Sequence, residues 1–270
     1  MIVVKFGGSV LKDSSSLPKV YETISKEKTQ ELVVVVSAFY GVTDKLIECA
    51  YNAAKNIDIS FQIIEQHQTI IKNSGLDISI LDDLFGEFLK AIESIKIYKE
   101  VNAKILDYIM AFGERFSARV ISAYLNLKGM RTRYFEGSEV GIRTNSDFGK
   151  AAPLPSTYLA VANFFRRVDF IPVVAGFIAR DLNENYTTLG RNGSDYTAAI
   201  ISYACLAECL KIYSDVDGIL TGNPSFIKNA KAIDELSLSE YQELQYWLRR
   251  IHPHMLGSVI EKNIPLLLLN

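Results

Sequence analysis

The chain has few of the residues that build disulfide scaffolds and metal centres. Its 270 residues include three cysteines and three histidines. An odd number of cysteines without a regular spacing excludes the framework of a small secreted domain and favours a reducing compartment. Cys205 and Cys209 have no cluster of further ligands beside them, so buried thiols explain them better than metal ligands do. We therefore predict no metal held by protein side chains.

An excess of one charge and long apolar runs are also missing. The formal net charge is −2 and the isoelectric point is about 6.0. Such a balance makes nucleic acids and anionic membranes poor partners and leaves a small charged metabolite open. The longest apolar runs are far shorter than the roughly 20 residues that span a bilayer, and the N-terminus lacks the pattern of a signal peptide. We expect a cytoplasmic protein that binds neither nucleic acid nor membrane.

What the sequence does have is apolar material for a substantial core, at 49% hydrophobic residues. Short β-branched runs alternate with longer helical patterns, which predicts an α/β fold with a mainly parallel sheet. The run of four valines at residues 33–36 has no polar alternation, which predicts a central strand covered on both faces. The predicted strands are residues 2–6, 32–37, 131–135, 170–175, 209–214 and 265–269.

The helical patterns divide the rest of the chain. The segment 57–98 is charged and interrupts the compact rhythm of strands, so we expect a lid or an oligomer surface there, outside the sheet. If the chain forms two lobes, the polar stretch 180–185 is the natural seam between them. The predicted helices are residues 43–55, 60–73, 81–95, 103–127, 156–166, 195–207, 239–248 and 254–261.

A glycine-rich loop that runs directly into a helix is the most informative motif, TTLGRNGSDYTA at residues 187–198. Gly190 and Gly193 let the backbone approach a ligand, and Arg191 adds a fixed positive charge. Ser194 or Asp195 is expected to cap the helix. The amides at a helix start suit phosphate or carboxylate. Taken alone, the motif is equally consistent with an ordinary capped turn.

Three further segments combine small residues with charge. Lys5 precedes two glycines at the end of the first strand, where open α/β sheets bind ligands, although no P-loop pattern is present. A second strand, turn and helix transition covers residues 36–46. A third segment places Gly113 and Glu114 inside a long apolar helix. A glycine there costs about 1 kcal/mol, so it should permit a close approach. The simpler alternatives are a solvated strand end for Lys5, and a surface ion pair with Arg115 or Arg131 for Glu114.

Together these segments resemble the corresponding segments of aspartate kinases. The similarity includes the opening KFGG, the turn SAFYGVTD, the glycine-rich loop and the later DVDGI at residues 215–219, and so extends over nearly the whole chain. It implies the amino-acid kinase fold, a three-layer αβα sandwich. It also implies ATP-dependent phosphorylation of the β-carboxylate of L-aspartate, the first step towards lysine, threonine and methionine.

The resemblance also implies roles for individual residues. Lys5 would contact the transferring phosphate and Asp195 would position it. An aspartate carboxylate, with a reference pKa of about 3.9, is already ionised at neutral pH and needs no general base. Mg²⁺ would be carried by the nucleotide phosphates and water. The implied aspartate pocket comprises Thr43, Glu114, Phe177, Arg191 and Ser194, and the implied nucleotide site comprises Lys5, Gly7, Gly8, Ser9, Ser214, Asp215, Leu220 and Arg249.

The sequence departs from the family pattern at the nucleotide site. The opening is one residue shorter than the usual KFGGTSV. Leu220 stands where a tyrosine is common, Asn223 and Ser225 replace the ends of an Asp-Pro-Arg segment, and Arg249 replaces a lysine. These changes leave the preference for ATP open. The chain also stops where paired ACT regulatory domains often follow, so we expect no feedback control through an attached domain, while a separate regulatory chain stays possible.

We therefore expect one catalytic domain over residues 1–270, with a substrate lobe over about 1–180, a nucleotide lobe over about 181–270, and a homodimer. One alternative is another kinase of this fold, acting on acetylglutamate, uridylate or isopentenyl phosphate. The loop 191–195 argues against it. A second alternative is a non-catalytic subunit that senses nucleotide or aspartate. It predicts ligand-dependent thermal stabilisation without turnover.

Overall fold

The computed structural model describes residues 1–27, 31–215 and 261–270, together with isolated positions between 218 and 259. Its centre is a sheet of six strands in the order β3-β4-β2-β1-β7-β8. Every neighbouring pair is parallel. The six predicted strands are confirmed, with each end within one residue of its prediction. Their bounds are β1 (Ile2–Phe6), β2 (Leu32–Val36), β3 (Thr132–Glu136), β4 (Ile171–Ala175), β7 (Cys209–Tyr213) and β8 (Leu266–Leu269).

The helices confirm the remaining pattern and add one α-helix and one short 3₁₀ helix that were not predicted. The missed helix α1 does carry an apolar stripe at helical spacing, with Leu17, Val20 and Ile24 buried, so its signal was present in the sequence. The helices predicted at residues 239–248 and 254–261 lie largely outside the described residues. None of the described helices is long and apolar enough to cross a membrane. The observed bounds are α1 (Ser16–Ser25), α2 (Val42–Ala54), α3 (Ser60–Asn73), the 3₁₀ helix η1 (Ile78–Leu81), α4 (Asp82–Tyr98), α5 (Ala103–Leu127), α6 (Ser156–Phe165) and α7 (Gly193–Cys205).

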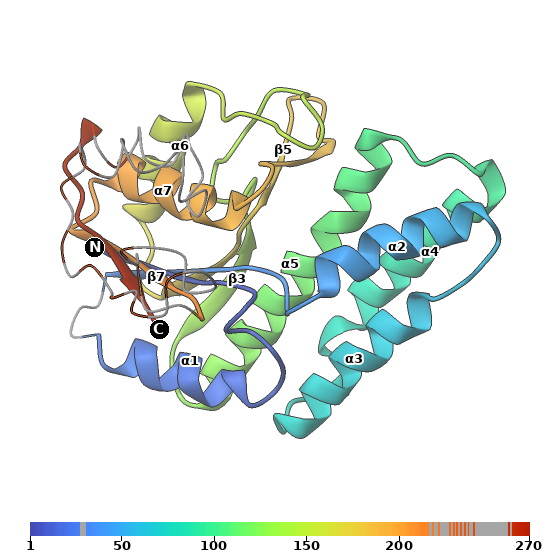
Figure 1. The fold of residues 1–270 in the computed structure, drawn as a ribbon, viewed down its shortest axis with the longest axis horizontal. Helices are drawn as coiled ribbons and strands as arrows, with labels where there is room; N and C mark the ends of the chain where they lie inside the picture. Colours follow the sequence, from blue (N-terminus) through green and yellow to red (C-terminus); the bar gives the residue numbers. More distant parts are fainter. Residues whose placement is uncertain are drawn as a thin grey trace.

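Helices cover both faces of the sheet and make three layers (Figure 1). Along β2, Val34 and Val36 pack into a core that includes α1 and α5. Val33 and Val35 pack into a second core, which includes α6 and α7. All four valine side chains are buried because successive residues of a strand face opposite sides. This confirms the prediction of a central strand covered on both faces.

The segment 57–98 lies outside the sheet, as predicted. Its helices α3 and α4 pack with α2 and α5 into a helical bundle that extends away from the strands (Figure 1). The aromatic rings of Phe85, Phe88 and Phe116 pack together inside this bundle. They belong to the same hydrophobic core as Val34 and Val36, so the bundle is continuous with the core on that face of the sheet. A lid or oligomer role for this segment stays a prediction.

A short antiparallel hairpin leads into the glycine-rich motif, whose first two residues belong to its second strand. It consists of β5 (Ile178–Arg180) and β6 (Tyr186–Thr188), each three residues long, which is too short for a sequence pattern to reveal. The polar stretch 180–185, expected as a seam between lobes, forms the turn of this hairpin. Because β1 pairs with both β2 and β7, one continuous sheet joins the two parts of the chain.

Candidate active site

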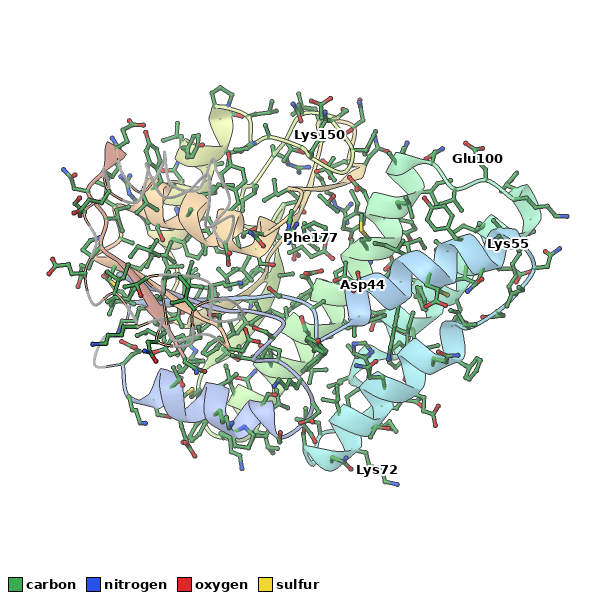
Figure 2. All side chains as sticks on the ribbon, viewed as in Figure 1. Asp44, Lys55, Lys72, Glu100, Lys150 and Phe177 are labelled. Atoms are coloured by element: carbon green, nitrogen blue, oxygen red, sulfur yellow. The ribbon has the colours of Figure 1, made fainter. Side chains whose placement is uncertain are left out.

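A cleft of about 950 Å³ opens at the carboxyl ends of β1, β2, β4 and β7. Figure 2 labels two of its residues, Phe177 and Asp44, in the middle of the molecule between the sheet and the helical bundle. Leu220 and Arg249, expected at the nucleotide site, lie outside the described residues. All other predicted site residues line the cleft, namely Lys5, Gly7, Gly8, Ser9, Thr43, Glu114, Phe177, Arg191, Ser194, Asp195, Ser214 and Asp215.

Lys5 and Asp195 form an ion pair at the centre of the cleft. Lys5 lies near the end of β1, and Asp195 lies in the first turn of α7. The Lys5 Nζ is 2.5 Å from Asp195 Oδ1, and each side chain is 10% exposed. An ion pair that is buried to this degree keeps its geometry, because separation would leave two poorly solvated charges inside the protein. The first strand and the glycine-rich loop therefore meet at one charged centre, and a solvated strand end is excluded for Lys5.

The glycine-rich loop enters α7 earlier than its sequence predicts. The helix begins at Gly193, after Asn192 in a left-handed conformation with φ of 58°. Ser194 and Asp195 therefore lie in the first turn, and the prediction that one of them caps the helix is wrong. Both line the cleft instead. A left-handed Asn192 starts the helix because asparagine tolerates this conformation better than most residues.

Close packing fixes this helix start against the turn after β4. A Cβ on Gly176 would lie 2.7 Å from the Cβ of Ser194, and a Cβ on Gly193 would lie 2.6 Å from Cδ2 of Phe177. Phe177 itself has a positive φ of 64°, which is strained for an aromatic residue. Its N–H donates to Thr197 Oγ1 at 2.9 Å. The strain is held by these contacts, and they place the ring at the wall of the cleft.

Glu114 carries a carboxyl group that is buried within α5. It is 3% exposed, and burial raises its pKa to about 8, against the opposing effects of the Ala38 N–H, its own backbone and the Lys5 charge. Oε1 accepts the Ala38 N–H at 3.1 Å. Oε2 accepts no hydrogen bond from the residues that the structure describes. Such an oxygen suits an ammonium group brought by a ligand.

The alternative of a surface ion pair for Glu114 is excluded by the partners of the two arginines. Arg115 pairs with Glu87 and Glu136, and Arg131 pairs with Asp169. The glycine before Glu114 has the expected reason, because a Cβ there would lie 2.9 Å from the Cβ of Ala38. Helix α5 therefore contacts the turn after β2 directly.

The predicted nucleotide residues form a second wall. The Gly7 N–H donates to the Tyr213 carbonyl at 3.0 Å, and the Ser214 N–H donates to the Leu269 carbonyl at 2.8 Å. Ser9 Oγ accepts the Asp215 N–H at 3.3 Å. These bonds join the loop after β1 to the ends of β7 and β8. Within the described part of the chain, no group of three or more His, Cys, Asp or Glu side chains could hold a metal ion.

Sequence reasoning missed Asp107, which contacts the cleft wall from behind. This residue of α5 is fully buried and accepts hydrogen bonds from Gly149 and Thr188, both of which line the cleft. Asp107 lies seven residues before Glu114, which is two turns of the same helix and therefore the same face. That spacing of two acids on an apolar helix was the available signal.

Comparisons with known proteins agree with this geometry. A profile of the amino acid kinase family matches residues 1–270. Aspartokinase 1, chloroplastic, of Arabidopsis thaliana is 31% identical over 97% of this chain, and the aspartokinase of Chlamydia trachomatis is 33% identical over 98%. The match covers 48% of the first relative and 60% of the second, so the chain spans about half the length of the curated relatives.

A solved structure extends the likeness to three dimensions. The E. coli aspartokinase III in complex with aspartate and ADP superposes with a TM-score of 0.80 at 26% identity, over 99% of this chain and 61% of that one. The parallel sheet between helical layers and the match of the family profile to the whole sequence lead to one assignment. The chain belongs to the amino acid kinase family.

Proposed function

We propose that the protein phosphorylates the β-carboxylate of L-aspartate with ATP, giving 4-phospho-L-aspartate and ADP. The observation that carries the proposal is the ion pair of Lys5 with Asp195, in one cleft with the buried carboxyl group of Glu114. The names of the three similar proteins described above, each an aspartokinase, support the same reaction. The product belongs to the first step towards lysine, threonine and methionine.

In this proposal, the substrate pocket binds both the ammonium group and a carboxylate group of the amino acid. Glu114 receives the ammonium group, because its Oε2 is buried and accepts no hydrogen bond from the described residues. Arg191 is exposed at the glycine-rich loop and grips a carboxylate. Thr43 and Ser194 supply hydroxyl groups, and Phe177 closes the wall.

The phosphoryl transfer needs charge neutralisation more than proton transfer. A carboxylate oxygen of the substrate forms a bond to the γ-phosphorus, and the bond to the β,γ-bridging oxygen breaks. Its electron pair leaves with ADP. Lys5 and the amides at the start of α7 reduce the repulsion between the two anions. Asp195 holds the Lys5 ammonium at 2.5 Å and so acts as a positioning group.

The nucleotide would lie along Gly7, Gly8, Ser9, Ser214 and Asp215. Leu220 and Arg249 stay predicted contacts of its base or phosphates. The described residues offer no cluster that would bind Mg²⁺ by itself. This donor set fits a Mg²⁺ ion that arrives on the nucleotide phosphates and keeps most of its waters. The ion would neutralise phosphate charge.

Other features of the proposal come from the sequence and its family resemblance. They are the division into a substrate lobe over about 1–180 and a nucleotide lobe over about 181–270, a homodimer, a separate regulatory chain, and a cytoplasmic location. Each stays a prediction.

A substrate panel tests the proposed reaction. ADP release is measured with L-aspartate, L-glutamate, N-acetyl-L-glutamate, uridylate and isopentenyl phosphate in turn, and hydroxylamine is added to trap any acyl phosphate as a hydroxamate. We expect ADP release and hydroxamate with L-aspartate only. ADP release that is indifferent to L-aspartate would reject the proposal. Thermal stabilisation by L-aspartate or MgATP without turnover would instead favour the sensing subunit.

A further inference from the structure

A buried carboxylate on α5 ties together two segments of the cleft wall. Asp107 Oδ2 accepts the N–H of Gly149 at 2.9 Å and the N–H of Thr188 at 2.8 Å. Its Oδ1 accepts the Thr188 hydroxyl at 2.8 Å. Asp107 itself does not line the cleft, whereas Gly149 and Thr188 do.

The two segments also touch each other next to the glycine-rich loop. The position of a Cβ on Gly190 is 3.4 Å from the Gly149 carbonyl oxygen and 3.6 Å from Cα of Lys150. Thr188 lies two residues before Gly190, so the carboxylate fixes the loop at its base. The next residue after Gly190 is Arg191, which we propose binds the substrate carboxylate.

The physical chemistry of the carboxylate makes this clamp specific. Burial raises the Asp107 pKa, while the three donors from Gly149 and Thr188 lower it. A buried carboxylate is tolerated only when donors surround it, and each donor it loses costs free energy. Charge-assisted hydrogen bonds are about twice as strong as neutral ones, so Asp107 restrains both loops more firmly than an amide would.

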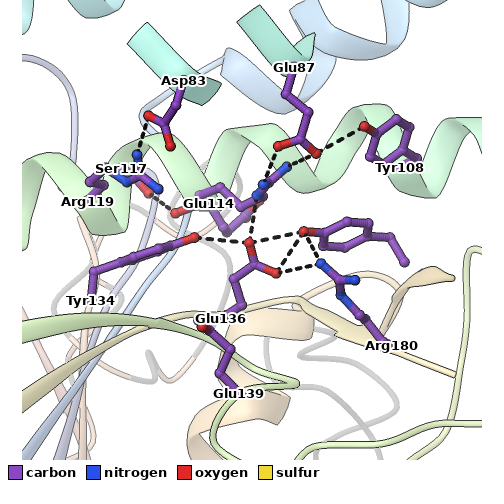
Figure 3. Close-up of polar contacts among 12 residues, drawn as sticks. Asp83, Glu87, Tyr108, Glu114, Ser117, Arg119, Tyr134, Glu136, Glu139 and Arg180 are labelled. Carbon is purple, nitrogen blue, oxygen red and sulfur yellow. Dashed lines mark hydrogen bonds and ion pairs between the residues drawn. The ribbon is translucent and has the colours of Figure 1, made fainter. Parts of the chain in front are cut away.

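Strand β6 has a second, independent anchor. The Tyr186 hydroxyl donates to Glu136, which also pairs with Arg115 and accepts from Tyr134 (Figure 3). Tyr186 and Thr188 face the same side because strand residues alternate. Loss of the Asp107 contacts should therefore loosen the loop beyond Thr188 while β6 stays attached.

We propose that Asp107 is a positioning residue that holds the glycine-rich loop and the Gly149 segment in place, and thereby sets the affinity of the cleft for its acidic amino-acid substrate. The proposal rests on the function proposed above. Asp107 acts through Thr188 and the loop that carries Arg191, and it touches no reacting atom.

The test compares Asp107→Asn with the wild type. Asparagine keeps the shape, but its amide nitrogen cannot accept an N–H. We expect the KM for L-aspartate to rise between about 10-fold and 100-fold, since small misplacements of binding groups have effects of this size. The KM for ATP should stay within about twofold, because the predicted nucleotide residues are held by other bonds.

A neighbouring hydroxyl offers the matched control. Thr187 is also fully buried on β6, but its Oγ1 bonds to Thr144 Oγ1 at 2.7 Å, on the opposite side of the strand. Thr187→Val should lower the melting temperature and leave the KM for L-aspartate unchanged. Thr188→Val removes one of the three donors to Asp107, so it should raise this KM less than Asp107→Asn, and the two changes should not be additive.

Amide hydrogen exchange of the ligand-free protein provides a readout without turnover. In Asp107→Asn, the amides of Gly149 and Thr188 should exchange faster, while the amides of β1 and β2 stay protected. Unchanged exchange at both amides would overturn the proposal, as would faster exchange with an unchanged KM for L-aspartate. If the wild type does not phosphorylate L-aspartate, the proposed function fails, and the exchange comparison still decides whether Asp107 holds the two segments.

Discussion

The ammonium of Lys5 lies 2.5 Å from the carboxylate of Asp195, which joins the first strand of the sheet to the first turn of α7. A lysine held in this way is fixed where a phosphate oxygen can meet it, together with the amides of a helix start. The proposed phosphoryl transfer depends on this ion pair more than on any other single contact in the cleft.

Removal of this lysine should abolish turnover. We expect Lys5→Ala to lower kcat by at least about 10²-fold to 10³-fold, the usual cost of removing a group that stabilises transition-state charge. Circular dichroism should show an intact fold. Lys211→Ala is the matched control, because Lys211 is also a strand lysine in an ion pair, with the Glu27 carboxylate at 2.7 Å, but lies outside the cleft. Normal turnover by Lys5→Ala would remove the lysine from the mechanism.

The raised pKa of Glu114 predicts proton release on substrate binding. In the empty cleft, burial raises this pKa from 4.5 to about 8, so the carboxyl group is mostly protonated at pH 7. A bound ammonium favours the ionised form. Titration calorimetry at pH 7 in buffers of different ionisation enthalpy should therefore show nearly one proton released per L-aspartate. Glu114→Gln should show none, whereas Glu139→Gln, outside the cleft, should match the wild type.

The same shift predicts how stability depends on pH. Between about pH 4.5 and pH 8 the folded protein keeps a proton on Glu114 that the unfolded chain has lost. The free energy of unfolding therefore falls as the pH rises through this window. Urea titrations should show a flatter profile for Glu114→Gln, whose advantage over the wild type grows towards pH 8. An advantage that grows towards low pH would contradict the assignment.

Arg191 should decide substrate affinity without affecting stability. Its side chain is exposed, so Arg191→Ala should change the free energy of unfolding by no more than about 0.5 kcal/mol. Loss of a charge-assisted contact to a carboxylate, worth about 1.5–3 kcal/mol, should raise the KM for L-aspartate about 10-fold to 100-fold. Arg166→Ala, an exposed arginine after α6, should leave the KM unchanged. An unaffected KM in Arg191→Ala would assign the carboxylate to another group.

Two helical glycines should respond to alanine in opposite directions. A Cβ on Gly113 would lie 2.9 Å from the Cβ of Ala38, whereas a Cβ on Gly86 in α4 would meet no atom within 4 Å. Gly86→Ala should raise stability by about 0.5–1 kcal/mol through helix propensity. Gly113→Ala should lower stability and turnover together, since it pushes α5 away from the turn after β2. Thermal unfolding and ADP release measure both.

The network around Arg115 should contribute to stability far more than a surface ion pair does. Arg115 is 7% exposed and contacts Glu87 and Glu136 at 2.7 Å each. Arg115→Met leaves Glu87 without its ion-pair partner and Glu136 with Arg180 alone, at 3.4 Å, and should cost about 3–5 kcal/mol. Arg131 and Asp169 form a pair that is more than 70% exposed, so Arg131→Ala should cost at most about 1 kcal/mol. Equal losses in chemical denaturation would contradict this reading.

The sequence by itself determined the strands, most of the helices and the segments that line the cleft. Runs such as Val33 to Val36 can only be buried on both faces, because apolar side chains on alternating sides need two covers. The glycines and charges at the strand ends then predicted a site along the carboxyl edge of a parallel sheet. Each of these patterns lies within one short segment of the sequence, so it can be recognised without knowing which distant residues pack against that segment.

Only the tertiary structure decided which charges meet. Arg115 follows a glutamate and Asp195 follows a serine in the sequence, yet Arg115 is bound in a polar network of distant residues and Asp195 holds Lys5. The packing of α5 against distant loops decided that Glu114 faces the cleft and not the solvent. The same packing decided that Asp107 accepts a hydrogen bond from Gly149. Burial and ion pairing arise from contacts between separate segments, and only the folded chain fixes the low dielectric and the partners that give each charge its role.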